Sequence, residues 1–352
     1  MHAYDRASAN DDQPRPRATL LWCVTYGAVG LLLLWLPLLC VLWPSRPYVA
    51  DLLAMTAAYP LLLYLPVGAI AWLVHRKMAA WHILMAFLVT AGCLTYLNLP
   101  IGNPAVVPQM ARASAPGSAP PRRVTFVSFN LHGDADTDQD KFATWCLSKD
   151  AQVISVMGPT DSTLLYRRLV TERGFQRAEW YNEHLYVDGH ARMRSPWTER
   201  QPGDFDLPGG IVLFITDLRM GERLHVLPGG FASPRTPDDW RFALGRAAQV
   251  GRACAWLDMN LAPPVVACHD NNSTMVGQVY RDFALCSGLC DAMATNAPHG
   301  SWPAGLPTWA SLPIDHIWIS RKLRLVDSGV GPDMGTLHRP VWATVELPQV
   351  EP

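Results

Sequence analysis

Acidic and imidazole side chains occur together at two points near the end of this 352-residue chain. Asp315 and His316 come directly before an apolar run, and His338 comes shortly before another run that begins at Val341. A carboxylate can orient or deprotonate a water molecule, and an imidazole can stabilise charge that develops on a reacting group. An Asp-His pair followed by a His-x-Pro segment therefore makes hydrolysis of a phosphoester the first chemistry to consider.

Two earlier segments place amide and carboxylate groups at the ends of apolar runs. Asn130 follows the run 124–129, and Asp270 and Asn272 follow the run 265–268. A spacing of two residues in an extended chain puts Asp270 and Asn272 on the same side. Either segment alone could also be an ordinary turn, because Asn and Asp are common turn residues.

The elements that must position these side chains are short apolar strands interspersed with helices from residue 124 onward. This pattern predicts an α/β domain with mixed sheets, arranged as a two-layered β-sandwich flanked by helices. The expected strands span residues 124–129, 153–157, 210–215, 224–227, 265–268, 314–319 and 341–347. The expected helices span residues 140–149, 163–172 and 240–257.

Five short motifs occur in order between residues 122 and 347, and together they resemble the endonuclease/exonuclease/phosphatase superfamily. They read SFNLHG from Ser128, HDNN from His269, SWPAG from Ser301, IDHIWIS from Ile314 and HRPVWATVEL from His338. The sequence is most similar to the bacterial branch that has three membrane spans ahead of the hydrolase domain. The resemblance implies a metal-dependent phosphoester hydrolase with Mg²⁺ or Mn²⁺ as cofactor and a phosphate-bearing substrate.

The resemblance also implies a role for each catalytic candidate. Asp270 and Asn272 match residues that orient the attacking water and bind phosphate. Asp315 matches a residue that supports the catalytic end of the sheet. His338 matches the residue that stabilises charge on phosphorus, and Asn130 matches an asparagine of the metal site.

Cation and substrate ligands follow from the same resemblance. The implied metal ligands are Asn130, Asp270 and Asp315, and the implied substrate-binding residues are Asn130, Asn272 and His316. Mg²⁺ is usually held by one or two carboxylates together with substrate phosphates and waters. Asp270 and Asp315 are the acidic candidates of this set, and because the family's main metal-binding Glu has no counterpart here, the metal affinity should be lowered.

Three positions depart from the family pattern. Gly158 stands where the family has a metal-binding Glu, and Leu337 stands where it has an Asp before the last His. Residues 227–231 contain no His, although the family has one after the corresponding strand. An Asp beside a His favours the charged imidazole. The alternative hypothesis is therefore an inactive pseudoenzyme, without cofactor, that serves as an extracytoplasmic binding or assembly module. The histidines considered as replacements are His225, His269 and His299.

The first hundred residues predict a membrane anchor. The runs 20–43, 52–74 and 83–100 contain no charged side chain, and each is about long enough to cross a bilayer core of roughly 30 Å. Basic residues concentrate in the N-terminal tail and the second loop, which the positive-inside rule places in the cytoplasm. The expectation is a multi-pass protein of the bacterial inner membrane with a periplasmic C-terminal domain. Its expected parts are a cytoplasmic tail (1–19), three spans (20–100), a Pro/Ala/Ser linker (101–123) and the hydrolase-like domain (124–348).

The charge of the hydrolase-like domain bears on its partners. Residues 122–352 carry 22 basic and 26 acidic side chains, a formal net charge of −4. A nonspecific nuclease usually needs a basic surface, so nucleic acid is not the favoured partner. The predicted tether makes the bilayer a partner and favours a lipid- or glycan-linked phosphate as substrate.

Overall fold

The computed structural model describes residues 47–55, 84, 88, 108–111, 121–131, 138–158, 163–180, 183–194, 213–219, 221–296 and 300–348. The chain divides into two compact units, Met1–Leu94 and Thr95–Pro352. The described part of the first unit includes helix α3 (Tyr48–Met55), and most of the three predicted spans lies outside the described residues. Within the described ranges, no helix is both long enough and apolar enough to cross a membrane.

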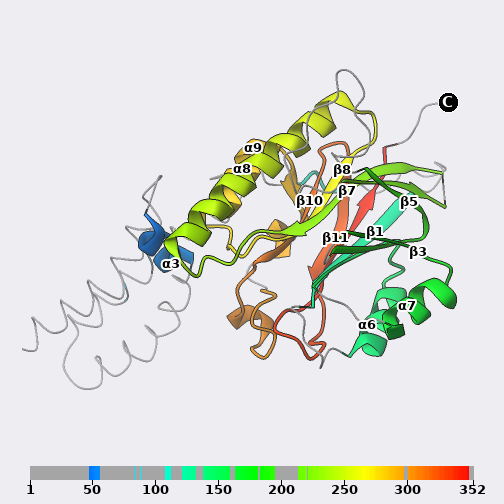
Figure 1. Cartoon of the computed structure of the whole chain (residues 1–352), viewed down its shortest axis with the longest axis horizontal. Coiled ribbons are helices and arrows are strands. Elements are labelled where there is room, and N and C mark those ends of the chain that lie inside the picture. Colours follow the sequence, from blue (N-terminus) through cyan, green and yellow to red (C-terminus); the bar gives the residue numbers. More distant parts are fainter. Residues whose placement is uncertain are drawn as a thin grey trace, which may run out of the picture. The chain divides into compact units, whose positions relative to one another are not determined.

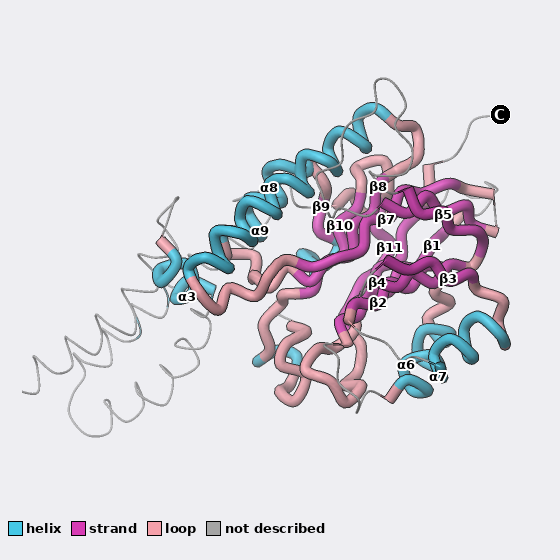
Figure 2. The backbone as a smooth tube through the Cα atoms, viewed as in Figure 1, coloured by secondary structure: helices cyan, strands magenta, loops and turns pink. Residues whose placement is uncertain are grey.

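Two six-stranded sheets form the centre of the second unit (Figures 1 and 2). The strand order of the first sheet is β11 (Arg324–Val330), β12 (Val341–Glu346), β1 (Arg123–Asn130), β2 (Val153–Met157), β4 (Glu183–Val187) and β3 (Gln176–Trp180). The order of the second sheet is β5 (Gly189–Arg194), β6 (Leu213–Leu218), β7 (Arg223–Gly230), β8 (Val265–Asp270), β10 (Asp315–Ile319) and β9 (Cys290–Asp291). Both sheets are mixed, because β1 is parallel to β2 and β7 is parallel to β8 while the other neighbours are antiparallel.

Helices cover the outer face of each sheet (Figure 1). The first sheet carries α6 (Gln139–Ser148) and α7 (Thr163–Tyr166), which continues as a π-helical turn, Arg167–Thr171. The second sheet carries α8 (Pro237–Asn260) and α9 (Gln278–Ser287). Two short 3-10 helices, Ala292–Asn296 and Thr308–Ala310, lie in the loops that follow. The architecture is therefore helix, sheet, sheet, helix.

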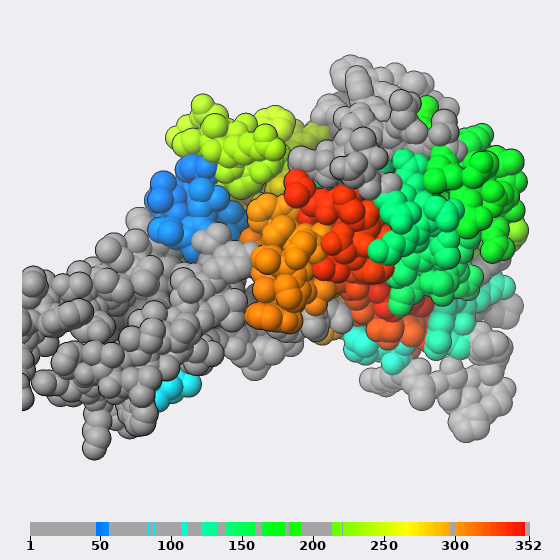
Figure 3. Space-filling model, turned by 90° about the horizontal axis from the view of Figure 1, so that it is seen from below, coloured from blue at the N-terminus to red at the C-terminus, as the bar shows by residue number. Residues whose placement is uncertain are grey.

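Local sequence explains where the longest helix begins and how closely it packs. Thr236 caps α8 in a capping box with Asp239, and Pro237 occupies the first turn, where its missing N–H costs nothing. Gly251 allows α8 to lie tightly against α9, because a Cβ at this position would come within 2.8 Å of Cys286 Cβ. The C-terminal segment (red in Figure 3) lies beside residues of the first half of the domain, as the pairing of β12 with β1 requires.

Alternation along the strands divides the buried side chains between three cores. On β1, Val124 and Phe126 belong to the core between the sheets, whereas Val127 and Phe129 face α6. The central strands are buried on both faces, so they are mostly apolar and do not alternate regularly with polar residues. A residue an even number of positions from one of these core residues on the same strand therefore has the same parity and lies on the same face of the sheet.

The predicted fold class is confirmed: the domain is α/β, with two mixed six-stranded sheets and flanking helices. The strands β3, β4, β5, β9 and β11 and the helix α9 were not predicted. Part of the predicted linker is also different, because residues 109–111 pair with the edge strand β11. Ala111 N donates to Leu325 O at 2.7 Å, and Leu325 N donates to Gln109 O at 2.8 Å.

Candidate functional site

Three of the predicted site residues lie at the same end of the sandwich, on the face between the sheets. Asn130 is the last residue of β1 and shares its parity with Val124 and Phe126 of the inter-sheet core. Asp270 is the last residue of β8 and Asp315 is the first residue of the antiparallel strand β10, where the two are direct cross-strand partners. The fold thus brings together residues that are far apart in the sequence.

Asp270 is held by three N–H groups from two asparagines. Asn130 Nδ2 donates to Asp270 Oδ2 at 2.9 Å, and the backbone N–H of Asn272 donates to Oδ1 at 2.8 Å. Asn272 Nδ2 donates to Phe231 O at 2.8 Å and to Asp270 Oδ2 at 3.2 Å. Asn272 adopts a left-handed backbone with φ of 46°, which Asn tolerates better than most residues. Because both amide hydrogens of Asn272 point to these acceptors, its role in this geometry is to position Asp270.

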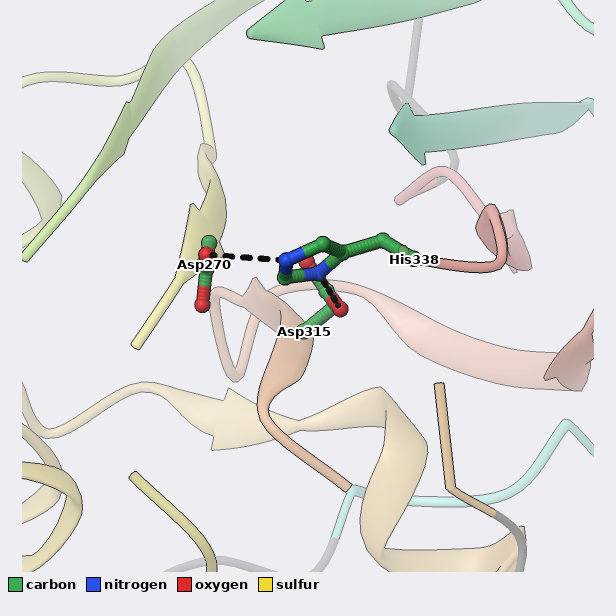
Figure 4. A group of neighbouring side chains, drawn as sticks. All are labelled: Asp270, Asp315 and His338. Carbon is green, nitrogen blue, oxygen red and sulfur yellow. Dashed lines mark hydrogen bonds and ion pairs between the residues drawn. The ribbon is translucent and has the colours of Figure 1, made fainter. Parts of the chain in front are cut away.

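His338 lies between the two aspartates (Figure 4). Its Nδ1 is 2.9 Å from Asp315 Oδ2, and its Nε2 is 3.9 Å from Asp270 Oδ2. Ser301 Oγ donates to the same oxygen of Asp315 at 2.5 Å. Since a carboxylate oxygen accepts, the imidazole carries a hydrogen on Nδ1 and directs Nε2 toward Asp270. The residue that orients the imidazole is therefore Asp315, on β10.

Leu337 does not disturb this arrangement. Its side chain is 46% exposed, and its backbone carbonyl accepts from Ala304 N at 2.8 Å. In the family pattern, an Asp at this position would lie beside the His and favour its charged form. The structure supplies that contact from Asp315, so the substitution at residue 337 leaves the imidazole held.

Burial and repulsion between carboxylates raise the pKa of Asp270 and of Glu183. Burial and the negative charge of Asp315 raise the pKa of Asp270 to about 7, although His338 and the hydrogen bonds from the asparagines oppose the shift. Burial and the charge of Asp270 also raise the pKa of Glu183 to about 7. A carboxylate with such a pKa can accept a proton near neutral pH.

His316 is not brought into this group, although it was a predicted substrate-binding residue. It follows Asp315 on β10, so its side chain points to the opposite face, toward Tyr280 and Trp318. Its Nδ1 is 2.9 Å from Asp291 Oδ2, and its Nε2 is 3.2 Å from Pro313 O. The side chain is fully buried, and the structure gives it a structural role.

The histidines considered as replacements do not join the group either. His269 precedes Asp270 on β8 and packs against Phe231 and Phe283 on the helix side of the sheet. Burial and the charges of Arg246 and His316 lower the pKa of His269 to about 3. His225 is buried within β7. His299 lies outside the described residues.

Two further residues, Glu183 and Ser301, lie at this end of the sandwich and were not predicted as site residues. Ser301 was noted only as the first letter of a motif, yet its hydroxyl contacts Asp315. Glu183 begins β4, a strand that was not predicted. Its position two residues before the apolar Leu185 was the signal that could have placed it on the inner face, had the strand been recognised.

The donor set suits a hard cation in type and charge. Asp270, Asp315 and His338 each offer a ligand atom within 4.8 Å of the other two. Asp315 Oδ1 and Glu183 Oε2 are buried acceptors that receive no hydrogen bond from any described residue. Carboxylate oxygens without donors favour Mg²⁺ or Mn²⁺ as partner. The side chains that could hold such a cation together are therefore Asp270, Asp315 and His338, and Glu183 is a further carboxylate outside that group.

Comparison with known proteins supports the fold. No family model and no curated protein sequence matches this chain. An endonuclease/exonuclease/phosphatase family protein from Bacteroides thetaiotaomicron matches in structure with a TM-score of 0.51 and 14% identity, over 65% of this chain and 97% of that one. A mannosyl-6-phosphatase from Bacteroides thetaiotaomicron VPI-5482 gives 0.48 and 14%, over 63% and 99%. The human Nocturnin catalytic domain with bound sulfate gives 0.47 and 13%, over 64% and 94%. The domain thus has the endonuclease/exonuclease/phosphatase fold.

Proposed function

We propose that this protein is a divalent-cation-dependent phosphoester hydrolase. The observation that carries the proposal is the arrangement of Asp270, His338 and Asp315, in which two asparagines hold one carboxylate and a second carboxylate orients an imidazole toward it. Fold alone does not determine function, so the proposal depends on these side chains.

Asp270 is the residue that acts on water in this mechanism. Asn130 and Asn272 fix its orientation, and its raised pKa suits it to accept the proton of a water molecule that attacks phosphorus. His338 faces the same space through Nε2 and stabilises negative charge on the phosphoryl oxygens. Asp315 and Ser301 keep the imidazole in this orientation.

A divalent cation held by the carboxylates would polarise the phosphoryl oxygens as a Lewis acid. Asp270 and Asp315 are the acidic side chains whose ligand atoms converge, together with His338, and Glu183 is a further carboxylate at this end of the sandwich. Asp315 Oδ2 is already engaged by His338 and Ser301, so its other oxygen is the one that remains for a cation.

The second candidate function is a binding or assembly module that has lost hydrolysis. Asp270, Asp315 and His338 are each at most 3% exposed, and Gly158 carries no side chain at the end of β2. A site that holds its polar groups this deeply could bind an anion or stabilise the fold without turnover. This reading predicts phosphate binding without hydrolysis.

Hydrolysis by the purified full-length protein in detergent separates the two candidates. A phosphodiester and a phosphomonoester of p-nitrophenol, each with Mg²⁺ or Mn²⁺, are suitable substrates. We expect turnover that is abolished in Asp270→Asn and in His338→Ala but kept in Glu179→Gln, an exposed residue of β3. No turnover with any of these substrates and cations would contradict the proposal and leave the binding module.

We further propose that the N-terminal runs anchor the domain outside the cytoplasm and that its substrate is a lipid- or glycan-linked phosphate. The support is the absence of charged residues from the three runs, the basic residues of the tail and second loop, and the −4 charge of residues 122–352. A reporter fused after Pro352 should be active in the periplasm. Activity confined to the cytoplasm would contradict this topology.

A further inference from the structure

The start of β4 presents a carboxylate on the same face as the proposed catalytic residues. Glu183 is the cross-strand partner of Met157, which in turn is the partner of Asn130. On β4, Leu185 and Val187 belong to the core between the sheets. Glu183 shares their parity and therefore faces the inter-sheet side, as Asn130 does.

Asn130, Met157 and Glu183 form a row of cross-strand neighbours in the first sheet, and the second sheet has a corresponding row at the same end. Gly230, Asp270 and Asp315 are cross-strand neighbours on β7, β8 and β10. Asn130 of the first row reaches Asp270 of the second row through the hydrogen bond of 2.9 Å. The two rows therefore face each other at the end of the sandwich.

Glu183 lies opposite the part of β7 that has no side chains. A Cβ built on Gly229 would be 3.7 Å from His269 Nε2 and 3.9 Å from Glu183 Oε1, and one built on Gly230 would be 3.6 Å from Asp270 Cβ and 3.9 Å from Met157 Sδ. Gly229 and Gly230 themselves carry no side chain at this point of β7. Gly230 is exposed and Glu183 is only half-buried, so this is the accessible side of an otherwise buried group.

The carboxylate of Glu183 is incompletely paired. Its Oε2 is buried and receives no hydrogen bond from any described residue. Burying an ionised carboxylate without donors is unfavourable unless a cation or a proton compensates it. The charge of Asp270, which has the same sign, acts on this carboxylate and disfavours its ionised form.

We propose that Glu183 is a ligand of the divalent cation and that, with Asp270, it holds Mg²⁺ or Mn²⁺ on the Gly229–Gly230 side of the site. The ligand comes from β4, next to the end of β2 where Gly158 carries no side chain. The inference rests on the proposed function for the identity of the cation. The proposed metal-binding carboxylate thus lies on β4, which is the neighbour of β2 in the first sheet.

The test measures cation binding directly. The full-length protein in detergent is titrated with Mn²⁺, and the free ion is followed by electron paramagnetic resonance. We expect Glu183→Gln to weaken the affinity by about ten- to a hundredfold and Glu179→Gln to leave it unchanged. We also expect Glu183→Gln to raise the melting temperature of the metal-free protein, because the substitution removes an unpaired buried charge while keeping the shape of the side chain.

The outcomes separate this inference from the proposed function. Unchanged Mn²⁺ affinity in Glu183→Gln, with turnover kept by the unmodified protein, would overturn the ligand role while the hydrolase proposal stands. A lower melting temperature of the metal-free variant together with unchanged affinity would show a purely structural role. Weakened affinity in a protein that shows no turnover would support the ligand role and contradict hydrolysis. No Mn²⁺ binding by the unmodified protein would overturn both.

Discussion

Among the described residues, His338–Asp315 and His316–Asp291 are buried His–Asp pairs with the same short contact and different surroundings. His338 Nδ1 and His316 Nδ1 are each 2.9 Å from an Oδ2 atom, of Asp315 and Asp291 respectively. The second ring nitrogen differs: that of His316 is 3.2 Å from Pro313 O, whereas that of His338 is 3.9 Å from the carboxylate of Asp270.

The two aspartates, Asp315 and Asp291, also differ in their other hydrogen-bond partners. Asp291 also accepts from Tyr280 Oη at 2.8 Å and from Met293 N at 2.9 Å. These contacts join β9, β10 and α9 on the helix-covered side of the second sheet. The surroundings of the second ring nitrogen, rather than the His–Asp contact itself, therefore distinguish the proposed catalytic pair from the other pair.

Removing the imidazole of the first pair should have the largest effect. In His338→Ala we expect the rate of phosphoester hydrolysis to fall by about 10²–10⁴-fold, because the group that stabilises charge on phosphorus is lost. The measurement is kcat on a p-nitrophenyl phosphodiester, with circular dichroism to confirm folding. If His338→Ala lost as much folded structure as His316→Ala, the result would contradict a catalytic role for the first pair and a structural role for the second.

Removing the imidazole of the second pair should act on stability. In His316→Ala we expect the free energy of unfolding to fall by about 3–5 kcal/mol, because Asp291 stays buried without its cationic partner. Urea unfolding of the purified protein measures this. Activity per folded molecule should remain, and a selective loss of kcat at full stability would instead assign His316 to the site.

The His316–Asp291 pair should also make the stability of the protein depend on pH. Burial alone lowers the pKa of His316, but the charge of Asp291 and the hydrogen bond to it outweigh burial, so the pKa is raised above 6.5. The stabilisation is then fully present below pH 6.5 and is lost as pH rises through the folded-state pKa. We expect the stability difference between the unmodified protein and His316→Gln to shrink over that rise. A difference that grows with pH would contradict a charged His316.

The smallest effect should come from restoring an acidic residue beside His338. In Leu337→Asp we expect kcat to change by no more than about threefold and stability by about 0.5 kcal/mol or less, since the side chain is exposed and Asp315 already orients the ring. The same assay measures this change. A large gain in activity would show that Asp315 is an insufficient partner.

The sequence was sufficient to predict that Asn130 and Asp270 lie at the ends of their strands, because polar residues there interrupt apolar runs, and that Asp315 lies near the start of its strand. It did not indicate the face of His316, since Ile317, Trp318 and Ile319 are all apolar and a strand buried on both sides shows no alternation. The core assignments of Ile317 and Trp318, to opposite sides of the sheet, were needed to decide it.

Glu183 could not be predicted for a related reason. Its strand is short and almost wholly buried, so it lacks the polar alternation that reveals a strand in a sequence. Its proximity to Asp270 depends on the order of strands in both sheets, which pairs it with Met157 and places Gly229 opposite. Strand order is a property of the whole fold and cannot be derived from local pattern.

The pairing of residues 109–111 with β11 has a practical consequence. β11 is an edge strand, and the free N–H and C=O groups of an edge can recruit the edge of another molecule. Leu325 is bonded on this edge to Gln109 and Ala111, so the preceding segment shields part of it. A recombinant domain that starts at Val124 would expose these groups and should self-associate, whereas one that starts before Pro108 should stay dispersed.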